Sequence, residues 1–371
     1  MGRRLLTAPA VVLFAVLAAL LPESVAAAAV TPTSVISTLA GTGAARFGGD
    51  GGPAQQASLN QPRGQISQGP DGSLYFADTF NNRIRRISPN GVITTVAGNG
   101  AGTFGGDGGP ATAARLHWPH DVDVDSAGNV WIADAANHRI RMVSPDGVIR
   151  TVVGTGSAGF NGDGLAGTAT RINAPKAVVV TATHLWFSDG DNNRIRRMDL
   201  ATRVIRTVVG TGAGGYSGDG GPATQARIRG PRAIALDGDG VLYIADSRNH
   251  RIRRVGTDGI IRTVAGTGVA GFGGDGGSAT QARLNQPRGL TVAGGTLYIA
   301  DSDNSRVRRV VLSSGIISTL AGDGRPRFGG DGGPASSASL RNPRGLSFDS
   351  AGRLLVADML NNRIRVLAAD G

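Results

Sequence analysis

The chain repeats one pattern six times at intervals of 55 to 57 residues, and this periodicity limits the folds open to it more than any other feature. One phrase reads Phe-Gly-Gly-Asp-Gly-Gly in its first copy, and its aromatic residue recurs as Phe47, Phe104, Phe160, Tyr216, Phe272 and Phe328. A second phrase ends in Asn-Asn-Arg-Ile-Arg in its first copy, and its leading aspartate recurs as Asp78, Asp134, Asp189, Asp246, Asp301 and Asp358. A repeat of this length builds an array or a closed ring, so the 371 residues need not divide into two or three domains.

Each repeat contains short runs typical of β-strands, separated by turn pairs such as Asp71-Gly72. In the second repeat the runs are residues 121–125, 130–133, 139–143 and 148–153. The sixth repeat stops after its third run, whereas an unmatched run of the fourth type, residues 35–40, precedes the first repeat. We therefore predict an all-β fold, a six-bladed β-propeller of four-stranded blades, with its ring closed by the N-terminal strand.

The sequence motifs of the repeat resemble those of a known family. Pro-Arg-Gly-Leu, followed by Leu-Tyr-Ile-Ala-Asp-Ser and Asn-x-Arg-Ile-Arg-Arg-Val, resembles the NHL repeat. The attached Gly-Asp-Gly-Gly-Pro-Ala loop is similar to that of bacterial and teneurin-type NHL arrays, and the resemblance covers residues 35–367. It implies a β-propeller in an extracellular setting but no single activity, because relatives include binding modules, sensor domains and enzymes.

The N-terminus has the pattern of a secretory signal peptide. Basic residues precede an apolar stretch over residues 5–21, and an alanine run follows it. The stretch is shorter than the roughly 20 apolar residues that span a bilayer, and Pro9 interrupts it. We predict a signal peptide over residues 1–29 and a secreted or extracytoplasmic propeller over residues 30–371, monomeric and without a membrane span after cleavage.

Two residue types are missing from the expected mature chain. The sequence has no cysteine, which excludes disulfides, thiolate metal sites and thiol nucleophiles. Its only glutamate, Glu23, falls in the predicted signal peptide. Propeller enzymes that resemble gluconolactonases use a glutamate as a calcium ligand, and those that resemble strictosidine synthase use a catalytic glutamate. Both kinds of site are therefore disfavoured.

The positive charge belongs to the repeat. The formal net charge is +11, and the basic residues are all arginine except Lys176. They recur singly or as Arg-x-Arg-Arg along expected strands, with no basic tail and no RNA-binding signature, so we expect no nucleic-acid partner. Asp78, Asn81, Arg83 and Arg85 have counterparts in all six repeats, which favours a structural role in Asp–Arg pairs. The six loop aromatics are interpreted as loop anchors.

The residue after the repeat proline, here called the slot residue, is basic in five repeats and histidine in one. The six slot residues are Arg63, His120, Lys176, Arg232, Arg288 and Arg344. One from each blade is expected near the start of the innermost strand. If the side chains lean toward the mouth of the axial channel, their summed field attracts phosphate, sulfate or an acidic glycan. The alternative is that each turns between blades and pairs with a repeat aspartate. The repulsion of like charges around an empty channel favours that alternative.

The second repeat departs most from the others. Asp121 and Asp123 stand where the other repeats carry mainly small residues, and His120 precedes them. Alternation along one strand places the two carboxylates on one face about 7 Å apart, where they could bind a divalent cation with His120. The alternative is that they neutralise Arg63 and Lys176.

These observations favour a non-enzymatic module that binds through its loop-rich face. The expected partner is an extracellular protein or an anionic envelope or glycan ligand, and no cofactor is assigned. The competing hypothesis is a propeller enzyme, a hydrolase or lyase, with its site in the axial funnel and with or without a divalent cation.

Overall fold

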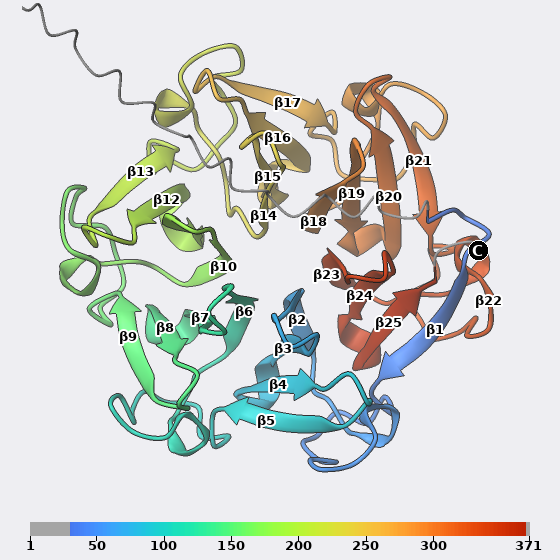
Figure 1. The fold of residues 1–371 in the computed structure, drawn as a ribbon. Coiled ribbons are helices and arrows are strands. Elements are labelled where there is room, and N and C mark those ends of the chain that lie inside the picture. Colours follow the sequence, from blue (N-terminus) through green and yellow to red (C-terminus); the bar gives the residue numbers. More distant parts are fainter. Residues whose placement is uncertain (1–29, 369–371) are drawn as a thin grey trace, which may run out of the picture.

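Turn pairs join the apolar runs of each repeat into an antiparallel sheet, and six such sheets surround one axis (Figure 1). The computed structural model describes residues 30–368. The predicted signal peptide, residues 1–29, lies outside the described residues. Within residues 30–368, no helix has the length and apolar character to cross a membrane.

Blades 1 to 5 each contain four strands, with the first nearest the axis (Figure 1). Blade 1 is β2 (Pro62–Gln68), β3 (Leu74–Asp78), β4 (Arg83–Ile87) and β5 (Ile93–Ala97); blade 2 is β6 (Pro119–Val124), β7 (Val130–Asp134), β8 (Arg139–Val143) and β9 (Ile149–Val153). Blade 3 is β10 (Pro175–Val180), β11 (His184–Asp189), β12 (Arg194–Asp199) and β13 (Ile205–Val209); blade 4 is β14 (Ile234–Leu236), β15 (Leu242–Asp246), β16 (Arg251–Val255) and β17 (Ile261–Ala265). Blade 5 is β18 (Pro287–Ala293), β19 (Thr296–Asp301), β20 (Arg306–Val311) and β21 (Ile316–Ala321).

Blade 6 is assembled from both ends of the described chain. Its inner strands are β23 (Pro343–Phe348), β24 (Leu354–Asp358) and β25 (Arg363–Leu367). The outer strand β1 (Val35–Ala40) pairs antiparallel with β25 and, on its other side, with the short β22 (Gly333–Pro334). The prediction that the N-terminal strand closes the ring is confirmed.

One-turn 3-10 helices occur twice per repeat. One set follows the second strand of each blade: Thr79–Asn81, Ala135–Asn137, Gly190–Asn192, Ser247–Asn249, Ser302–Asn304 and Met359–Asn361. The other set lies in the loops between blades: Ala54–Gln56, Ala111–Ala113, Gly167–Ala169, Ala223–Gln225, Ala279–Gln281 and Ala335–Ser337. The two kinds of connection meet on one face, since Asn81 donates a hydrogen bond to the carbonyl of Arg46 at 3.0 Å. This is the loop-rich face.

The apolar core lies between adjacent blades. The second strand of a blade is covered on both faces by its neighbours, so its residues form a nearly continuous apolar run, as in β15. One cluster joins Ile84 of blade 1 to Val122 and Ile132 of blade 2, all three fully buried. Burial of such side chains stabilises the fold by about 1.5–3 kcal/mol each.

A buried arginine stands at the centre of each repeat. Arg85 donates to Asp50 at 2.6 Å and to Asp78 at 3.1 Å, and its side chain is fully buried. The other five arginines each lie within 4 Å of both a loop and a repeat aspartate: Arg141, Arg196, Arg253, Arg308 and Arg365. The expected Asp–Arg pairing is confirmed. A different arginine holds each loop aromatic through a cation–π contact. The guanidinium of Arg83 lies 3.7 Å from the ring centroid of Phe47, and the other five repeats show the same kind of contact.

Candidate functional site: a ring of basic residues on the axis

In four blades the slot residue, which is His120, Lys176, Arg288 or Arg344, sits at a bulge in the innermost strand. The pairing of β10 with β11 shifts register between Pro175 and Ala177, and that of β18 with β19 shifts between Pro287 and Gly289. A bulge leaves one residue out of the ladder and re-aims its side chain. Simple alternation would instead place the slot side chains with the apolar residues of the strand. The bulge therefore frees Lys176 and Arg288 to turn toward the axis.

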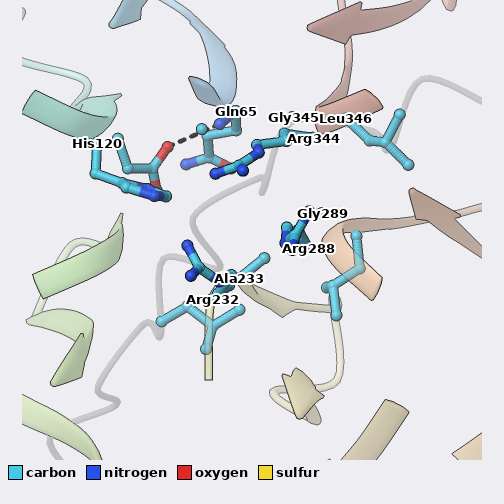
Figure 2. Close-up of a pocket in the computed structure, with 13 residues that line it drawn as sticks. Gln65, His120, Arg232, Ala233, Arg288, Gly289, Arg344, Gly345 and Leu346 are labelled. Carbon is cyan, nitrogen blue, oxygen red and sulfur yellow. Dashed lines mark hydrogen bonds between the residues drawn. The ribbon is translucent and has the colours of Figure 1, made fainter. Parts of the chain in front are cut away.

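The slot residues of different blades meet around the axis. Figure 2 shows His120, Arg232, Arg288 and Arg344 entering one small space from four blades. The cavity between them has a volume of about 20 Å³, enough for about one water molecule. We call the six residues Arg63, His120, Lys176, Arg232, Arg288 and Arg344 the axial ring.

Close packing of the innermost strands keeps this space narrow. A Cβ atom at Gly289 would lie 1.5 Å from the carbonyl oxygen of Arg344, and one at Gly345 would lie 1.5 Å from the carbonyl oxygen of Gly64. Glycine after the slot residue is therefore required where blades 5, 6 and 1 meet. The space at the centre of the ring is therefore too narrow for a ligand larger than a water molecule.

The ring residues perturb one another electrostatically. Burial, together with Arg232 and Arg288, lowers the pKa of Arg63 to about 10. Burial, with Arg288 and Arg248, lowers the pKa of Arg232 to about 10. The arginines stay charged at neutral pH, but in a site that disfavours their charge.

Burial also lowers the pKa values of three other ring residues, Lys176, Arg344 and His120. Burial lowers the pKa of Lys176 to about 8, and nearby Asp191 offsets only part of the effect. Burial, then Arg63 and its other cationic neighbours, holds the pKa of Arg344 well below its ordinary value. Burial, then Lys176, holds the pKa of His120 well below 6.5, so that imidazole is neutral at pH 7.

Few carboxylates compensate this charge. Arg288 forms an ion pair with Asp303 at 2.6 Å and also donates to Gln286 at 2.7 Å. Arg63 donates to the amide oxygen of Gln61 at 3.0 Å, and Arg344 donates to that of Asn342 at 3.0 Å.

Lys176 and Arg232 make no side-chain hydrogen bond or ion pair within residues 30–368. In the same part of the chain, nitrogens of four ring residues are buried without a partner: Arg63 Nε, His120 Nε2, Arg288 Nε and Arg344 Nη1. The expectation that the slot residues pair with the repeat aspartates is wrong, because the buried arginines of the third strands occupy those carboxylates.

The residue two positions after each repeat aspartate flanks the ring, and sequence reasoning largely missed this position. Phe80 lies under the guanidinium of Arg63, with 5.0 Å from Cζ to the ring centroid. Asp191 and Arg248 lie beside Lys176 and Arg232. The position could have been found as a second place where the six repeats disagree, since it also holds Ala136, Asp303 and Leu360.

Asp121 joins three blades through main-chain amides. Its Oδ1 accepts a hydrogen bond from the amide of Gln65 in blade 1 at 2.7 Å, and its Oδ2 accepts one from the amide of Val178 in blade 3 at 2.9 Å. Gln65 in turn donates its side-chain amide to the carbonyl of Val178 at 3.1 Å. Burial raises the pKa of Asp121 well above its ordinary value, against the opposing effect of these amides.

Asp123, two residues further along β6, also links blade 2 to both of its neighbours. It accepts from the hydroxyl of Ser67 at 2.7 Å and from the amide of Val180 at 2.8 Å. Burial raises its pKa to about 6. Gln65 and Ser67, the polar departures of the first repeat, are therefore the partners of the two aspartates.

His120, Asp121 and Asp123, the three residues considered as ligands of a divalent cation, each bind a different partner. His120 Nδ1 bonds to the carbonyl oxygen of Lys176 at 2.9 Å, whereas both carboxylates are held by neighbouring strands. No group of three or more metal-ligating side chains converges within residues 30–368. The alternative that Asp121 and Asp123 neutralise Arg63 and Lys176 is wrong, since their hydrogen-bond partners are amides and a hydroxyl.

Comparison with known proteins agrees with the repeat. Residues 36–104, 102–161 and 211–271 match the teneurin NHL domain, and residues 284–310 match the NHL repeat. The chain is 31% identical to SUPPRESSOR OF QUENCHING 1 of Arabidopsis thaliana over 71% of its own length and 26% of that protein. It is 32% identical to mouse teneurin-1 over 56% of its length and 8% of that protein.

The chain thus spans only a small part of these relatives. Among solved structures, an auxiliary nutrient binding protein from Bacteroides ovatus superposes with a TM-score of 0.66, at 17% identity, over 91% of this chain and 77% of that one. That likeness concerns the fold alone. The family matches, which together cover more than half of the sequence, and the six matching blades show that this chain belongs to the NHL-repeat family of β-propellers, with repeats of the teneurin type.

Proposed function

We propose that this propeller is an extracytoplasmic binding module that captures an anionic ligand at the axial ring on its loop-rich face. The observation that carries the proposal is the lack of compensation: of the five cations in the ring, only Arg288 is paired with a carboxylate within residues 30–368. Removing a cation from water without a counter-charge costs several kcal/mol. An external carboxylate, sulfate or phosphate supplies the missing partner.

The side chains suit that role. Arg63, Lys176, Arg232 and Arg344 are half-buried, so each residue is partly desolvated and still has surface in contact with water. Guanidinium groups bind oxyanions through two parallel hydrogen bonds, and partial desolvation strengthens them.

The test compares two arginine pairs. Binding of sulfate and of dextran sulfate is measured by calorimetry, at low and at high salt, for the wild type and for Arg232→Ala/Arg344→Ala. The control is Arg150→Ala/Arg206→Ala, which removes two exposed arginines of β9 and β13. We expect the ring variant to bind about tenfold more weakly or worse, because each lost charge-assisted hydrogen bond is worth about 1.5–3 kcal/mol.

Thermal unfolding distinguishes loss of the site from loss of the fold. Removing two cations that repel their neighbours leaves the melting temperature of the ring variant equal to or above that of the wild type. Binding by the wild type falls steeply with salt, since the mouth is exposed to screening. Equal binding by the ring variant and the wild type would overturn the proposal.

A further inference from the structure

Two exposed aromatic side chains lie beside the axial ring. Phe80 of blade 1 and Trp118, which precedes β6, stack with ring centroids 5.6 Å apart and an interplanar angle of 29°. Their exposed fractions are 38% and 47%. Phe80 also lies under Arg63, a member of the axial ring. Cation, phenyl ring and indole therefore form one continuous row on the loop-rich face.

The repeat does not require an aromatic at either position. Trp118 has a φ of 50°, and the equivalent residues all have φ between 48° and 56°: Gln61, Ala174, Gly230, Gln286 and Asn342. The backbone of the repeat imposes this left-handed conformation, which glycine and asparagine accept readily and a bulky residue does not. Trp118 thus carries backbone strain while half of its surface stays in water. A strained tryptophan that gains little from burial contributes little to stability, which points to a role for Trp118 in function.

We propose that Phe80 and Trp118, the aromatic shelf, stack against a sugar ring of an acidic saccharide whose carboxylate or sulfate group binds the axial ring. The inference rests on the proposed anion-binding function and names the class of its ligand. The flat C–H face of a pyranose packs on an indole, and an acidic substituent at the edge of the same sugar extends sideways. A row of cation and aromatic rings matches that combination of groups.

The arrangement favours a saccharide over single-stranded nucleic acid. Nucleic-acid sites combine a basic groove with several aromatic platforms, one for each successive base. Here the cations form a closed ring around an axis, and the stacked pair occurs where blades 1 and 2 meet. At the position of Phe80, the other repeats carry Ala136, Asp191, Arg248, Asp303 and Leu360, none of which is aromatic.

The experiment measures the affinity for an oligogalacturonate, the neutral maltotriose and inorganic sulfate by calorimetry. Trp118→Asn restores the residue type of Asn342 and relieves the strain. Phe160→Ala is the control, because Phe160 is 39% exposed and stacks over Arg194, but in an outer loop. We expect Trp118→Asn to weaken oligogalacturonate binding about three- to tenfold, with sulfate binding unchanged and the melting temperature equal or higher. Phe160→Ala should bind both ligands as the wild type does.

Indole fluorescence gives a second readout. Among the three tryptophans, Trp131 is buried, whereas Trp118 is 47% exposed. Oligogalacturonate should shift the emission to the blue in the wild type, and this shift should be much reduced in Trp118→Asn.

Three results would overturn the aromatic shelf. The first is an equal affinity of Trp118→Asn and the wild type for oligogalacturonate. The second is a melting temperature of Trp118→Asn below that of the wild type. The third is a single-stranded oligonucleotide that binds more tightly than oligogalacturonate and depends on Trp118. If sulfate and oligogalacturonate both fail to bind the wild type, the proposed function itself is wrong. If sulfate binds and the saccharide adds nothing, only the shelf is wrong.

Discussion

At the scale of single residues, Lys176 differs from the arginines that hold the same slot in four other blades. Burial lowers its pKa to about 8, whereas those of Arg63 and Arg232 are lowered only to about 10. Because a guanidinium keeps its proton in proteins whereas a buried lysine readily loses it, Lys176 is the ring cation expected to titrate in the mildly alkaline range.

This difference predicts a pH dependence of anion binding. Below pH 8 Lys176 is protonated and attracts the ligand; as the pH rises through about 8 it becomes neutral, and the affinity falls by about tenfold or less. A bound anion favours the charged form, so the midpoint in the complex lies above that of the unbound protein. Calorimetric titration with sulfate between pH 6.5 and 9 measures the step.

Substitutions at the same position isolate the effect. Lys176→Arg should remove the step and keep tight binding throughout, because an arginine there remains charged. Lys176→Gln should bind weakly at every pH without a step. A step near pH 8 that persists in Lys176→Arg would assign the titration to another group.

A second residue-scale prediction concerns the buried arginine of blade 3. Arg196 is fully buried between Asp163 at 3.0 Å and Asp189 at 3.6 Å. Arg196→Leu leaves the carboxylate of Asp189 buried without its cation, which should destabilise the protein by about 3–5 kcal/mol. Urea unfolding measures the loss.

The control for this prediction lies on the neighbouring strand of the same blade. Arg206 is exposed, so Arg206→Leu should change stability by about 0.5 kcal/mol at most. Similar destabilisation in the two variants would mean that the buried ion pairs do not hold the blades.

At the scale of elements, the strand that closes the ring carries its own prediction. In β1, Ile36 is fully buried, whereas Val35 is 48% exposed. Deleting residues 31–42 removes this strand from β25 and exposes the edge of blade 6, which should cost about 3 kcal/mol or more and promote aggregation. Thermal unfolding and light scattering of the truncated protein measure both effects.

Point substitutions test the same register without shortening the chain. Ile36→Ala should destabilise by about 2–5 kcal/mol and Val35→Ala by very little, because only the former empties a core position. The reverse order would place β1 in the opposite register.

The same scale shows what a sequence can and cannot predict. The strands, their number and the closure by residues 35–40 follow from six copies of one pattern, since any single ambiguous run is corrected by five others. The slot residues could be identified from the sequence, but the direction of their side chains could not be predicted, because the bulge after Pro175 depends on how the blades pack. Asp121 and Asp123 were visible as departures, but their partners Gln65 and Ser67 lie 56 residues away and meet them only in the ring.

At the scale of the whole molecule, the similarity of the six blades implies that any of them could be the blade that is completed by a strand from the other end of the chain. Each blade is held by the same kind of interblade core and buried arginine, and blade 6 is distinguished by being joined from two chain segments and by the added short strand β22. The ends of the described chain also lie close together, since the amide of Ala368 donates to the carbonyl of Val35 at 3.0 Å. Stability should therefore depend on completing the ring rather than on where the chain is cut.

A circular permutant tests this directly. A short Gly-Ser linker joins Ala368 to Thr31, and new ends are placed between Ala201 and Thr202, in the exposed turn between β12 and β13. Blade 3 is then closed by a separate outer strand, as blade 6 is here, and exposed turns are where such cuts are tolerated. We expect the circular dichroism spectrum of the wild type, a melting temperature within a few degrees of it, and unchanged sulfate binding, because the cut lies away from the axial ring. A permutant that melts far lower would show that blade 6 is specialised for closure and that the six blades are not energetically equivalent.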